Sequence, residues 1–413
     1  MQRLEAVVIL MKEIFSDIEF VFPKKADFEN FAKKFPLEPF SIETINFLDE
    51  FSKKLLDDQQ TKDYPDLITL SFFCRRANII QLKNKHCNSN ELRLGVGLLF
   101  HISPSNVAVN FAYSLISGLL SGNFNIIRLP SILFDQVEII CKVIKKINKD
   151  PKHFYITSRI ILVRYQRTSN ATKYLSSICD ARIIWGGNET INQIRENKIR
   201  SRSFDLTFAD RYSLCVINAD KYLKDNISKK IAKSFYNDTY LFDQNACTSP
   251  HLIIWLGDKD KVIKSRDIFW KSLHEILKHE YKVQPIIAVN KLATLFSQSI
   301  DINNIKNIKT EDNLIFRVEL EKLPKKIHKY RCSSGYFNEY HADNILEIKK
   351  IVNKSYQTLS YYGLEKKELK NFINESKIKG IDRIVPIGRT SEFSLIWDGY
   401  DLIRKLSRLC EII

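Results

Sequence analysis

One cysteine of this chain lies in a polar segment, whereas others stand among apolar residues. The segment FDQNACTSP, residues 242–250, contains Cys247, while Cys141 and Cys215 have apolar neighbours and are predicted to be core residues. A thiol that attacks a substrate must be partly exposed and must ionise readily, because burial in a low-dielectric interior raises its pKa. Two interpretations stay open: Cys247 is a surface thiol without a role, or it is a nucleophile.

A second polar segment, SPSN at residues 103–106, follows an apolar run at 93–102 that predicts a buried strand. The segment 106–120 then has the spacing of a helix. Strand carboxyl ends are where α/β sheets bind ligands. Asn106 either caps the helix with its side chain or donates its amide to a developing oxyanion.

Two adjacent glycines, Gly186 and Gly187, also follow a predicted strand and precede a predicted helix, in RIIWGGNETI. Glycines let a phosphate approach the backbone at a helix N-terminus, although most such pairs are only turns. The GVG at 95–97 is no dinucleotide fingerprint, because no glycine follows it at the required position.

The elements that would position these residues are expected to alternate between strand and helix after about residue 90. Residues 1–90 are rich in charge and are expected to be mostly helical. Such alternation is typical of an α/β fold with a largely parallel sheet. The pattern resumes after Cys247, which predicts a second α/β unit with the cysteine near the junction. Strands are expected at 93–102, 124–129, 159–165, 181–185, 213–217, 251–256 and 314–320, and helices at 106–120, 137–147, 172–179, 189–197, 227–238 and 261–279.

Composition narrows the class of protein. The 413 residues are 44% hydrophobic and 27% charged, as in a soluble globular protein, and the formal net charge is +16. The lysines are scattered and no nucleic-acid motif accompanies them, so we expect no nucleic-acid partner. Eight cysteines without a CxxC pair predict neither disulfides nor a metal site, and they favour a cytoplasmic setting. No apolar run is long enough for a membrane span, and the first one is short for a signal peptide.

Several longer stretches together resemble a known family. They are HISPSNV, FAYSLISGLLSGNFNIIRLPS, WGGNETI, FADRYSL, FYNDTYLFDQNACTSP and GIDRIVPIGRTSEFSLIWDGYDLI. In this order they resemble the fatty acyl-CoA reductases of bacterial luminescence systems, within the aldehyde dehydrogenase superfamily, over roughly residues 65–410. The resemblance implies an aldehyde dehydrogenase-like α/β fold, with a Rossmann-type cofactor domain, an α/β catalytic domain and often a small oligomerisation element. We expect a helical region at 1–90 packed on the cofactor domain, an NADP-binding domain at 91–240, a catalytic domain at 241–385 and a C-terminal segment at 386–413.

The resemblance also implies roles for single residues. Cys247 matches the family's nucleophile, and Asn106 matches the position whose amide faces the substrate oxygen. Arg128 stands where the superfamily usually has a lysine near the adenosine ribose, and Ser131 where many NAD-dependent members have a glutamate. We therefore expect NADPH as cofactor, against the alternative that Arg128 only ends its strand in solvent. The residues expected to bind the cofactor are Ser103, Pro104, Arg128, Ser131, Gly186 and Gly187.

One family feature is missing. The glutamate-leucine-glycine-glycine stretch that supplies a base in hydrolytic aldehyde dehydrogenases is not recognisable. Four carboxylates are candidates for that base, and each has the alternative of being a solvated charge: Glu189, Glu196, Asp205 and Asp210.

The reaction that the resemblance implies is NADPH-dependent reduction of a long-chain fatty acyl thioester to the aldehyde, through an acyl group on Cys247. The acyl donor would be acyl-CoA or an acylated partner protein, with an acyl-protein synthetase as a further partner, and the enzyme a homo-oligomer. Two alternatives remain. The chain is a non-catalytic scaffold or binding subunit, or it is an aldehyde dehydrogenase working toward the acid. The latter requires a water-activating carboxylate near Cys247.

Overall fold

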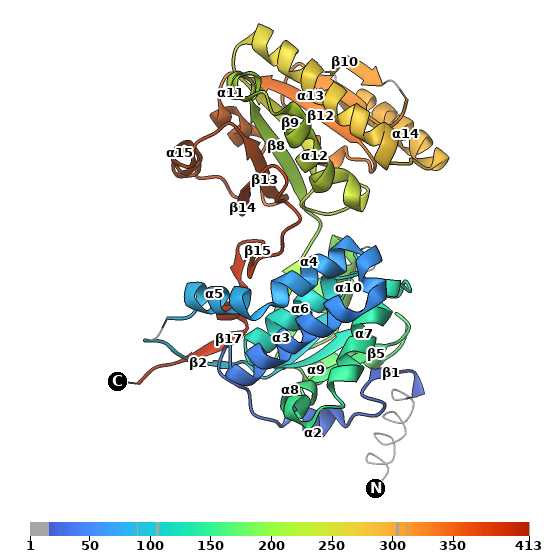
Figure 1. The fold of residues 1–413 in the computed structure, drawn as a ribbon, viewed down its shortest axis with the longest axis vertical. Coiled ribbons are helices and arrows are strands. Elements are labelled where there is room, and N and C mark those ends of the chain that lie inside the picture. Colours follow the sequence, from blue (N-terminus) through green and yellow to red (C-terminus); the bar gives the residue numbers. More distant parts are fainter. Residues whose placement is uncertain (1–15, 89, 105–106, 303–304, 311, 413) are drawn as a thin grey trace. The chain divides into compact units, whose positions relative to one another are not determined.

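The computed structural model describes residues 16–88, 90–104, 107–302, 305–310 and 312–412. It forms two compact units: unit 1 is Met1–Ala209 with Tyr400–Ile413, and unit 2 is Asp210–Gly399 (Figure 1). The domain change expected near residue 240 falls inside unit 2. The reason is that strand β8 (Tyr212–Asn218) hydrogen-bonds to β9 (Pro250–Leu256), which follows the cysteine loop.

Unit 1 is built on a six-stranded sheet, and with the sheet of unit 2 it confirms the predicted α/β class. The strand order is β1 (Glu19–Phe22), β5 (Ile160–Arg164), β4 (Phe124–Arg128), β3 (Leu98–Ile102), β6 (Ala181–Trp185) and β7 (Phe204–Phe208). Only β1 is antiparallel to its neighbour. The five parallel strands thus follow the doubly wound order third, second, first, fourth, fifth. This order reverses between β3 and β6, and ligands bind at such a reversal, outside the carboxyl ends of the strands.

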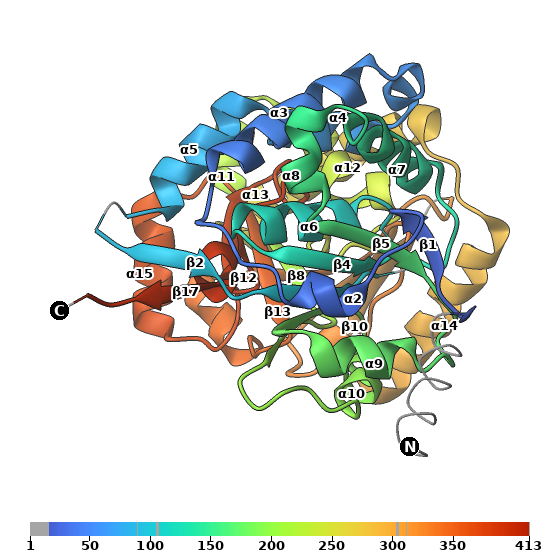
Figure 2. The same ribbon diagram turned by 90° about the horizontal axis from the view of Figure 1, so that it is seen from below.

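Helices cover both faces of this sheet, as Figure 2 shows. One face carries α3, α6 and α7, and the other carries α9 and α10. The bounds are α3 (Ile42–Asp57), α6 (Asn110–Leu120), α7 (Asp135–Ile147), α9 (Ala171–Ile178) and α10 (Asn188–Arg195). The second face is packed by residues of β3, β4 and β5 together with apolar side chains of α9 and α10.

Two local predictions in unit 1 were wrong. The run at 93–102 is two strands, β2 (Leu92–Gly95) and β3, because the chain turns at Gly97, whose φ of 130° suits glycine. A Cβ at Gly97 would also lie 2.2 Å from a carboxylate oxygen of Asp180. Helix α6 begins at Asn110 with Val109 as its N-cap, so the helix expected from residue 106 starts four residues later. Asn106 itself lies outside the described residues.

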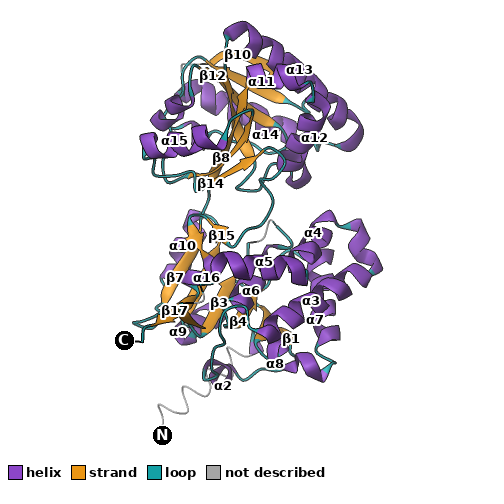
Figure 3. Ribbon diagram, turned by 60° about the vertical axis from the view of Figure 1, so that its left-hand side comes forward, coloured by secondary structure: helices purple, strands orange, loops and turns teal. Residues whose placement is uncertain are grey.

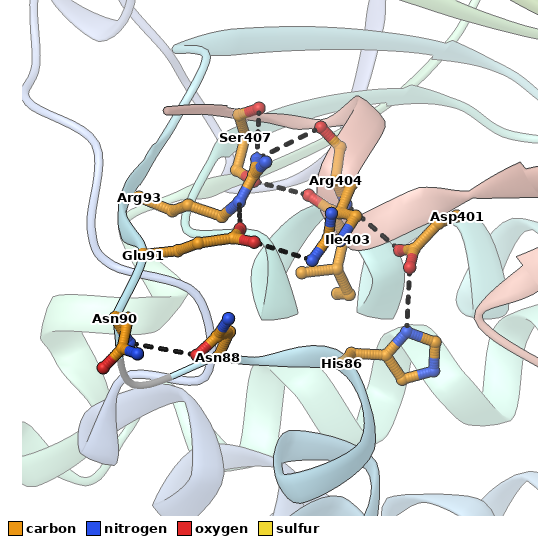
Figure 4. Close-up of polar contacts among 9 residues, drawn as sticks. All are labelled: His86, Asn88, Asn90, Glu91, Arg93, Asp401, Ile403, Arg404 and Ser407. Atoms are coloured by element: carbon orange, nitrogen blue, oxygen red, sulfur yellow. Dashed lines mark hydrogen bonds and ion pairs between the residues drawn. The ribbon is translucent and has the colours of Figure 1, made fainter. Parts of the chain in front are cut away.

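The segment Tyr400–Ile413 completes unit 1 by pairing its strand β17 (Ser407–Cys410) antiparallel to β2. Figure 4 shows the polar contacts that hold this ribbon. Arg93 Nη1 donates to Ser407 Oγ over 3.1 Å, and Arg93 Nε donates to Glu91 over 2.7 Å. Arg404 Nη2 donates to the other oxygen of Glu91 over 2.8 Å. The carboxylate of Glu91, directly before β2, thus joins Arg93 of β2 to Arg404, which precedes β17.

Unit 2 has a seven-stranded sheet with helices on both faces (Figure 3). Its order is β10 (Ile305–Thr310), β11 (Phe316–Leu320), β12 (Tyr336–Ala342), β9, β8, β13 (Tyr356–Tyr362) and β14 (Arg383–Pro386), and only β10 is antiparallel. On one face α11 (Ala219–Asp225), α12 (Ser228–Thr239) and α13 (Lys259–Glu280) contribute to the core, and on the other α14 (Pro285–Asp301) and α15 (Lys366–Ser376). The central strands are buried on both faces, which explains their continuous apolar sequences.

Candidate active site

Cys247 lies in a loop of unit 2 between a short 3₁₀ helix, η3 (Tyr240–Phe242), and strand β9. Gln244 anchors this loop with its amide, and the residue is only 1% exposed. Gln244 Nε2 donates to the carbonyls of Pro250 and Tyr336 over 3.0 and 3.2 Å. Its Oε1 accepts from the backbone N–H groups of Gly335 and Tyr336 at 2.8 and 3.1 Å. Three of these hydrogen bonds tie the loop to the start of β12, and the fourth ties it to Pro250 at the start of β9.

The loop lies at the amino edge of the sheet, where neighbouring parallel strands begin together. Cys247 precedes β9, Arg211 precedes β8 and Gln357 is the second residue of β13, and these three strands are neighbours. Ser213 Oγ donates to the carbonyl of Cys247 over 2.6 Å and accepts from the N–H of Thr358 at 3.2 Å. The parallel register thus gathers residues from distant segments around the cysteine.

The surroundings of the thiol do not favour its ionisation. Cys247 is partly exposed, as expected for a nucleophile. Burial nevertheless raises the pKa of its thiol to about 12, and the negative charge of Asp398 acts in the same direction. A hydrogen bond with the Gln357 side chain and the positive charge of Arg211 lower the pKa by less. The expectation of a readily ionised thiol is therefore not met by these residues.

Asp398 is a carboxylate of unit 2 whose negative charge raises the pKa of the Cys247 thiol, and sequence reasoning missed it. Gln357 Nε2 donates a short hydrogen bond to Asp398 Oδ1. Burial raises the pKa of Asp398, whereas the charge of Arg211 and the bond from Gln357 lower it. The stretch FSLIWDGYDLI, which carried part of the family resemblance, contains this residue, but no periodicity or spacing marks it as functional.

Two arginines complete the surroundings of the thiol. Arg211 Nη2 donates to the carbonyl of Tyr356 over 2.5 Å and pairs with Asp382. Arg383 donates to backbone carbonyls, among them that of Thr390 over 2.8 Å, and its pKa is lowered by burial. Both cations lie close enough to interact with Cys247 or with its thiolate.

In unit 1, the residues expected to bind the cofactor lie at the carboxyl edge of the sheet. Ser103 and Pro104 follow β3, Gly186 and Gly187 follow β6, and Arg128 ends β4. Because β3 pairs with both β4 and β6, the structure brings these segments together at the reversal of strand order. This is the position at which doubly wound sheets bind nucleotides.

Three observations fit a dinucleotide at this edge. The hydroxyl of Ser103 is buried and, within the part of the chain that the structure describes, has no hydrogen-bond partner. Helix α10 begins after Gly187, its N-cap, without a side chain that caps its first N–H groups. An added Cβ at Gly186 would meet only Thr190, so space remains above the turn. Free N–H groups at a helix N-terminus attract phosphate.

Arg128 is half-buried and is not simply solvated. Its Nη2 donates to the carbonyl of Tyr165 over 3.3 Å, and its guanidinium lies 4.7 Å from the centre of the Tyr165 ring. Burial lowers the pKa of Arg128. Ser131 is exposed in the segment that follows β4. No carboxylate stands between Arg128 and Ser131 in the sequence.

The four carboxylates considered as bases have other surroundings. Asp205 accepts from Arg182 Nε and Nη2 at 2.7 and 3.0 Å, and Arg182 is 1% exposed, so this pair stabilises unit 1. Glu189 and Glu196 are exposed on α10 and at its end. Asp210 is exposed and lies 3.5 Å from Arg331.

Within the described residues, no helix has the length and apolar character needed to cross a membrane. No three histidine, cysteine or carboxylate side chains among them converge as metal ligands do.

Comparison with known proteins places this geometry in context. A family described as Acyl-CoA reductase (LuxC) matches residues 75–411. The "Long-chain acyl-protein thioester reductase" of Vibrio harveyi is 25% identical over 325 residues, which are 77% of this chain and 64% of that protein; the chain thus spans less than two thirds of its relative.

Solved structures are similar in fold. Aldehyde dehydrogenase 21 of Physcomitrella patens has a TM-score of 0.64 at 8% identity, covering 92% of this chain and 86% of that one. Betaine aldehyde dehydrogenase of Staphylococcus aureus has a TM-score of 0.63 at 11% identity, covering 92% and 85%. These likenesses confirm the aldehyde dehydrogenase-like fold.

Proposed function

Because this chain belongs to the acyl-CoA reductase (LuxC) family, we propose that it reduces a long-chain fatty acyl thioester to the fatty aldehyde with NADPH, through an acyl group on Cys247. The observation that carries this proposal is the position of Cys247 in an anchored loop, partly exposed and surrounded by polar side chains. Unit 2 is the proposed catalytic domain, and unit 1 the proposed cofactor domain.

In the first half of the proposed reaction, Cys247 Sγ adds to the carbonyl carbon of the thioester. The bond from that carbon to the carrier sulfur breaks, and the carrier leaves as a thiol. NADPH, when bound, would supply the hydride for the second half, in which the bond from the acyl carbon to Cys247 Sγ breaks, the aldehyde leaves and the thiol regains its proton. In both halves negative charge develops on the same oxygen, and the proposed donors to it are the Asn106 amide and the backbone N–H of Cys247.

The acyl donor is proposed to be acyl-CoA or an acylated partner protein. The name of the Vibrio harveyi relative supports a protein-bound donor, and an acyl-protein synthetase is the class of partner that would supply it. For NADPH, the support is Arg128 at the end of β4 together with Ser131, since an arginine can bind a 2′-phosphate with two parallel hydrogen bonds.

Intact-mass measurement after mixing with a long-chain acyl-CoA tests the proposal directly. The wild type should gain the mass of one acyl group, and Cys247→Ala should gain none. The matched control is Cys332→Ala, because Cys332 is also a partly exposed thiol of unit 2, and this variant should be acylated like the wild type. Acylation of Cys247→Ala would refute the proposal.

Asp398 favours a second candidate, hydrolysis of the acyl-cysteine to a fatty acid, since a carboxylate whose charge acts on the nucleophile can also activate water. Single-turnover decay of the acylated protein without NADPH, with and without added thiol, separates the two. Free acid formed as fast as new thioester would favour hydrolysis, whereas slow acid formation would favour reduction.

A further inference from the structure

Helix α14 of unit 2 turns polar residues inward and apolar residues outward, the reverse of an ordinary surface helix. Of its 17 residues three are buried, and two of these are polar: Lys291, Leu295 and Gln298. Its large apolar side chains that are exposed are Ile286 at 56%, Val289 at 59%, Leu292 at 46%, Phe296 at 62% and Ile300 at 81%. Large apolar patches on a surface mark places where another molecule binds.

Hydrogen bonds hold α14 in this orientation. Lys291 Nζ donates a short hydrogen bond to the carbonyl of Asn313. Gln298 Nε2 donates to Asn338 Oδ1, and Gln298 Oε1 accepts from Tyr336 Oη, each over 2.7 Å. Rotation of the helix about its axis would bury the apolar side but would leave these buried polar groups unpaired. The apolar side therefore stays outward.

Five exposed residues of α14 follow the spacing of a coiled coil, and we call them the α14 seam: Ile286, Val289, Ala293, Phe296 and Ile300. Successive members are three, four, three and four residues apart, as are the a and d positions of a heptad repeat. Side chains at such positions insert between those of a facing helix. The pattern therefore indicates that a second helix covers α14.

The α14 seam is also free of charge. The charged residues of α14 are Lys291, which is buried, and Asp301, its last residue. The positions beside the seam are neutral as well: Asn290, Leu292, Ser297 and Ser299. The chain has a formal net charge of +16, so two copies repel each other over most of their surface. An uncharged apolar surface is where two copies can approach.

These features fit a second copy of the chain better than they fit a lipid surface. A helix that lies on an anionic membrane has lysines and arginines on its exposed polar face. The one cation of α14 is buried instead. A pair of copies related by a two-fold axis requires a surface that is complementary to itself. An uncharged apolar helix meets this requirement.

We propose that the α14 seam is a self-association surface, on which α14 of a second copy packs antiparallel about a two-fold axis. Ala293 is the middle residue of the seam, and its small side chain lets the two helices approach closely. Antiparallel packing also brings Lys282, which precedes α14 of one copy, toward Asp301 at the end of the other, and both are exposed. This association does not depend on the chemistry proposed for Cys247.

Analytical ultracentrifugation of the full chain tests this surface. One helix pair is small against the usual area of about 800 Å² per partner, so we expect a dissociation constant in the micromolar range. Phe296→Lys should raise that constant by at least about 30-fold, the usual effect of losing a central aromatic side chain. Ile300→Lys should change it in the same direction. The matched control is Ile263→Lys on α13, where Ile263 is 50% exposed, and it should associate like the wild type.

On dilution the wild type should pass from a larger species to one of half its mass, and the two seam variants should do so at higher concentration. A wild type that stays monomeric at about 100 μM, well above the expected dissociation constant, would overturn the proposal. If such a monomer bound phosphatidylglycerol vesicles and Phe296→Lys did not, the occupant would be lipid. Unchanged association of both seam variants would place the contact on another surface and would equally overturn the proposal.

Discussion

Replacing Gln244 by alanine should destabilise unit 2 and disturb the cysteine loop together. The substitution removes four hydrogen bonds and leaves two carbonyls and two N–H groups unpaired at a buried position. Each unpaired buried group costs about 1–3 kcal/mol, so the sum is about 4–12 kcal/mol if none finds a new partner. Truncation leaves room for water, which can bind these groups, so we expect the lower end, about 4 kcal/mol.

Urea unfolding followed by tryptophan fluorescence measures this loss, because Trp255 and Trp270 are buried in the core of unit 2. The matched control is Gln284→Ala, an exposed glutamine at the start of α14 whose side chain makes no capping bond, and its effect should stay within about 0.5 kcal/mol. Acylation of Gln244→Ala should also slow, since the loop that carries Cys247 loses its anchor. A loss below about 1 kcal/mol with normal acylation would refute the argument that Gln244 holds the loop.

Three further predictions concern unit 1 and the segment after β3. Asn106→Asp and Asn106→Ser should each reduce turnover by about 10²–10³-fold if the amide donates to the oxyanion, and near-normal kcat for either would exclude that role. In wild type we expect NADPH to be preferred over NADH by one to two orders of magnitude in kcat/KM, and Arg128→Ala or Ser131→Glu should reduce this preference; a preference that survives both would mean that other residues recognise the phosphate. Asp205→Ala should reduce the free energy of unfolding by about 3–5 kcal/mol, because Arg182 would keep a buried charge without its partner, and a small change would show that this pair is dispensable.

Much of the secondary structure could be predicted because strands such as β4, β6 and β9 are short apolar runs and helices such as α7 have a clear apolar face. The strands at 124–129, 181–185 and 251–256 correspond closely to β4, β6 and β9. The failures have local causes. An apolar run gives no sign that Gly97 bends it into two strands, and a polar residue before a helical pattern does not reveal how many residues pass before α6 begins.

The candidate site was only partly predictable. Cys247 stands out by the chemical contrast between a thiol and its polar neighbours, and the resemblance to a family adds a role. Gln357 and Asp398 lack such a contrast, since an amide in a strand and a carboxylate before a glycine are ordinary. They become notable only when the order of strands is known, because β9, β8 and β13 begin side by side. Residues that become neighbours only because their strands are adjacent in the sheet cannot be recognised from the pattern of a single sequence.

The ribbon of β2 and β17 has a consequence for how the protein is made. Strand β2 emerges from the ribosome early, but its partner belongs to the segment Tyr400–Ile413, which is translated only after all of unit 2. During synthesis Arg93 and Glu91 therefore lack their partners Ser407 and Arg404. The backbone groups along one edge of β2 are also unpaired until β17 is made. Unit 2 is continuous in sequence and can finish folding first. Until β17 pairs with β2, the unpaired strand edge of the nascent chain can aggregate with other chains. We therefore expect a chaperone to protect it during this interval.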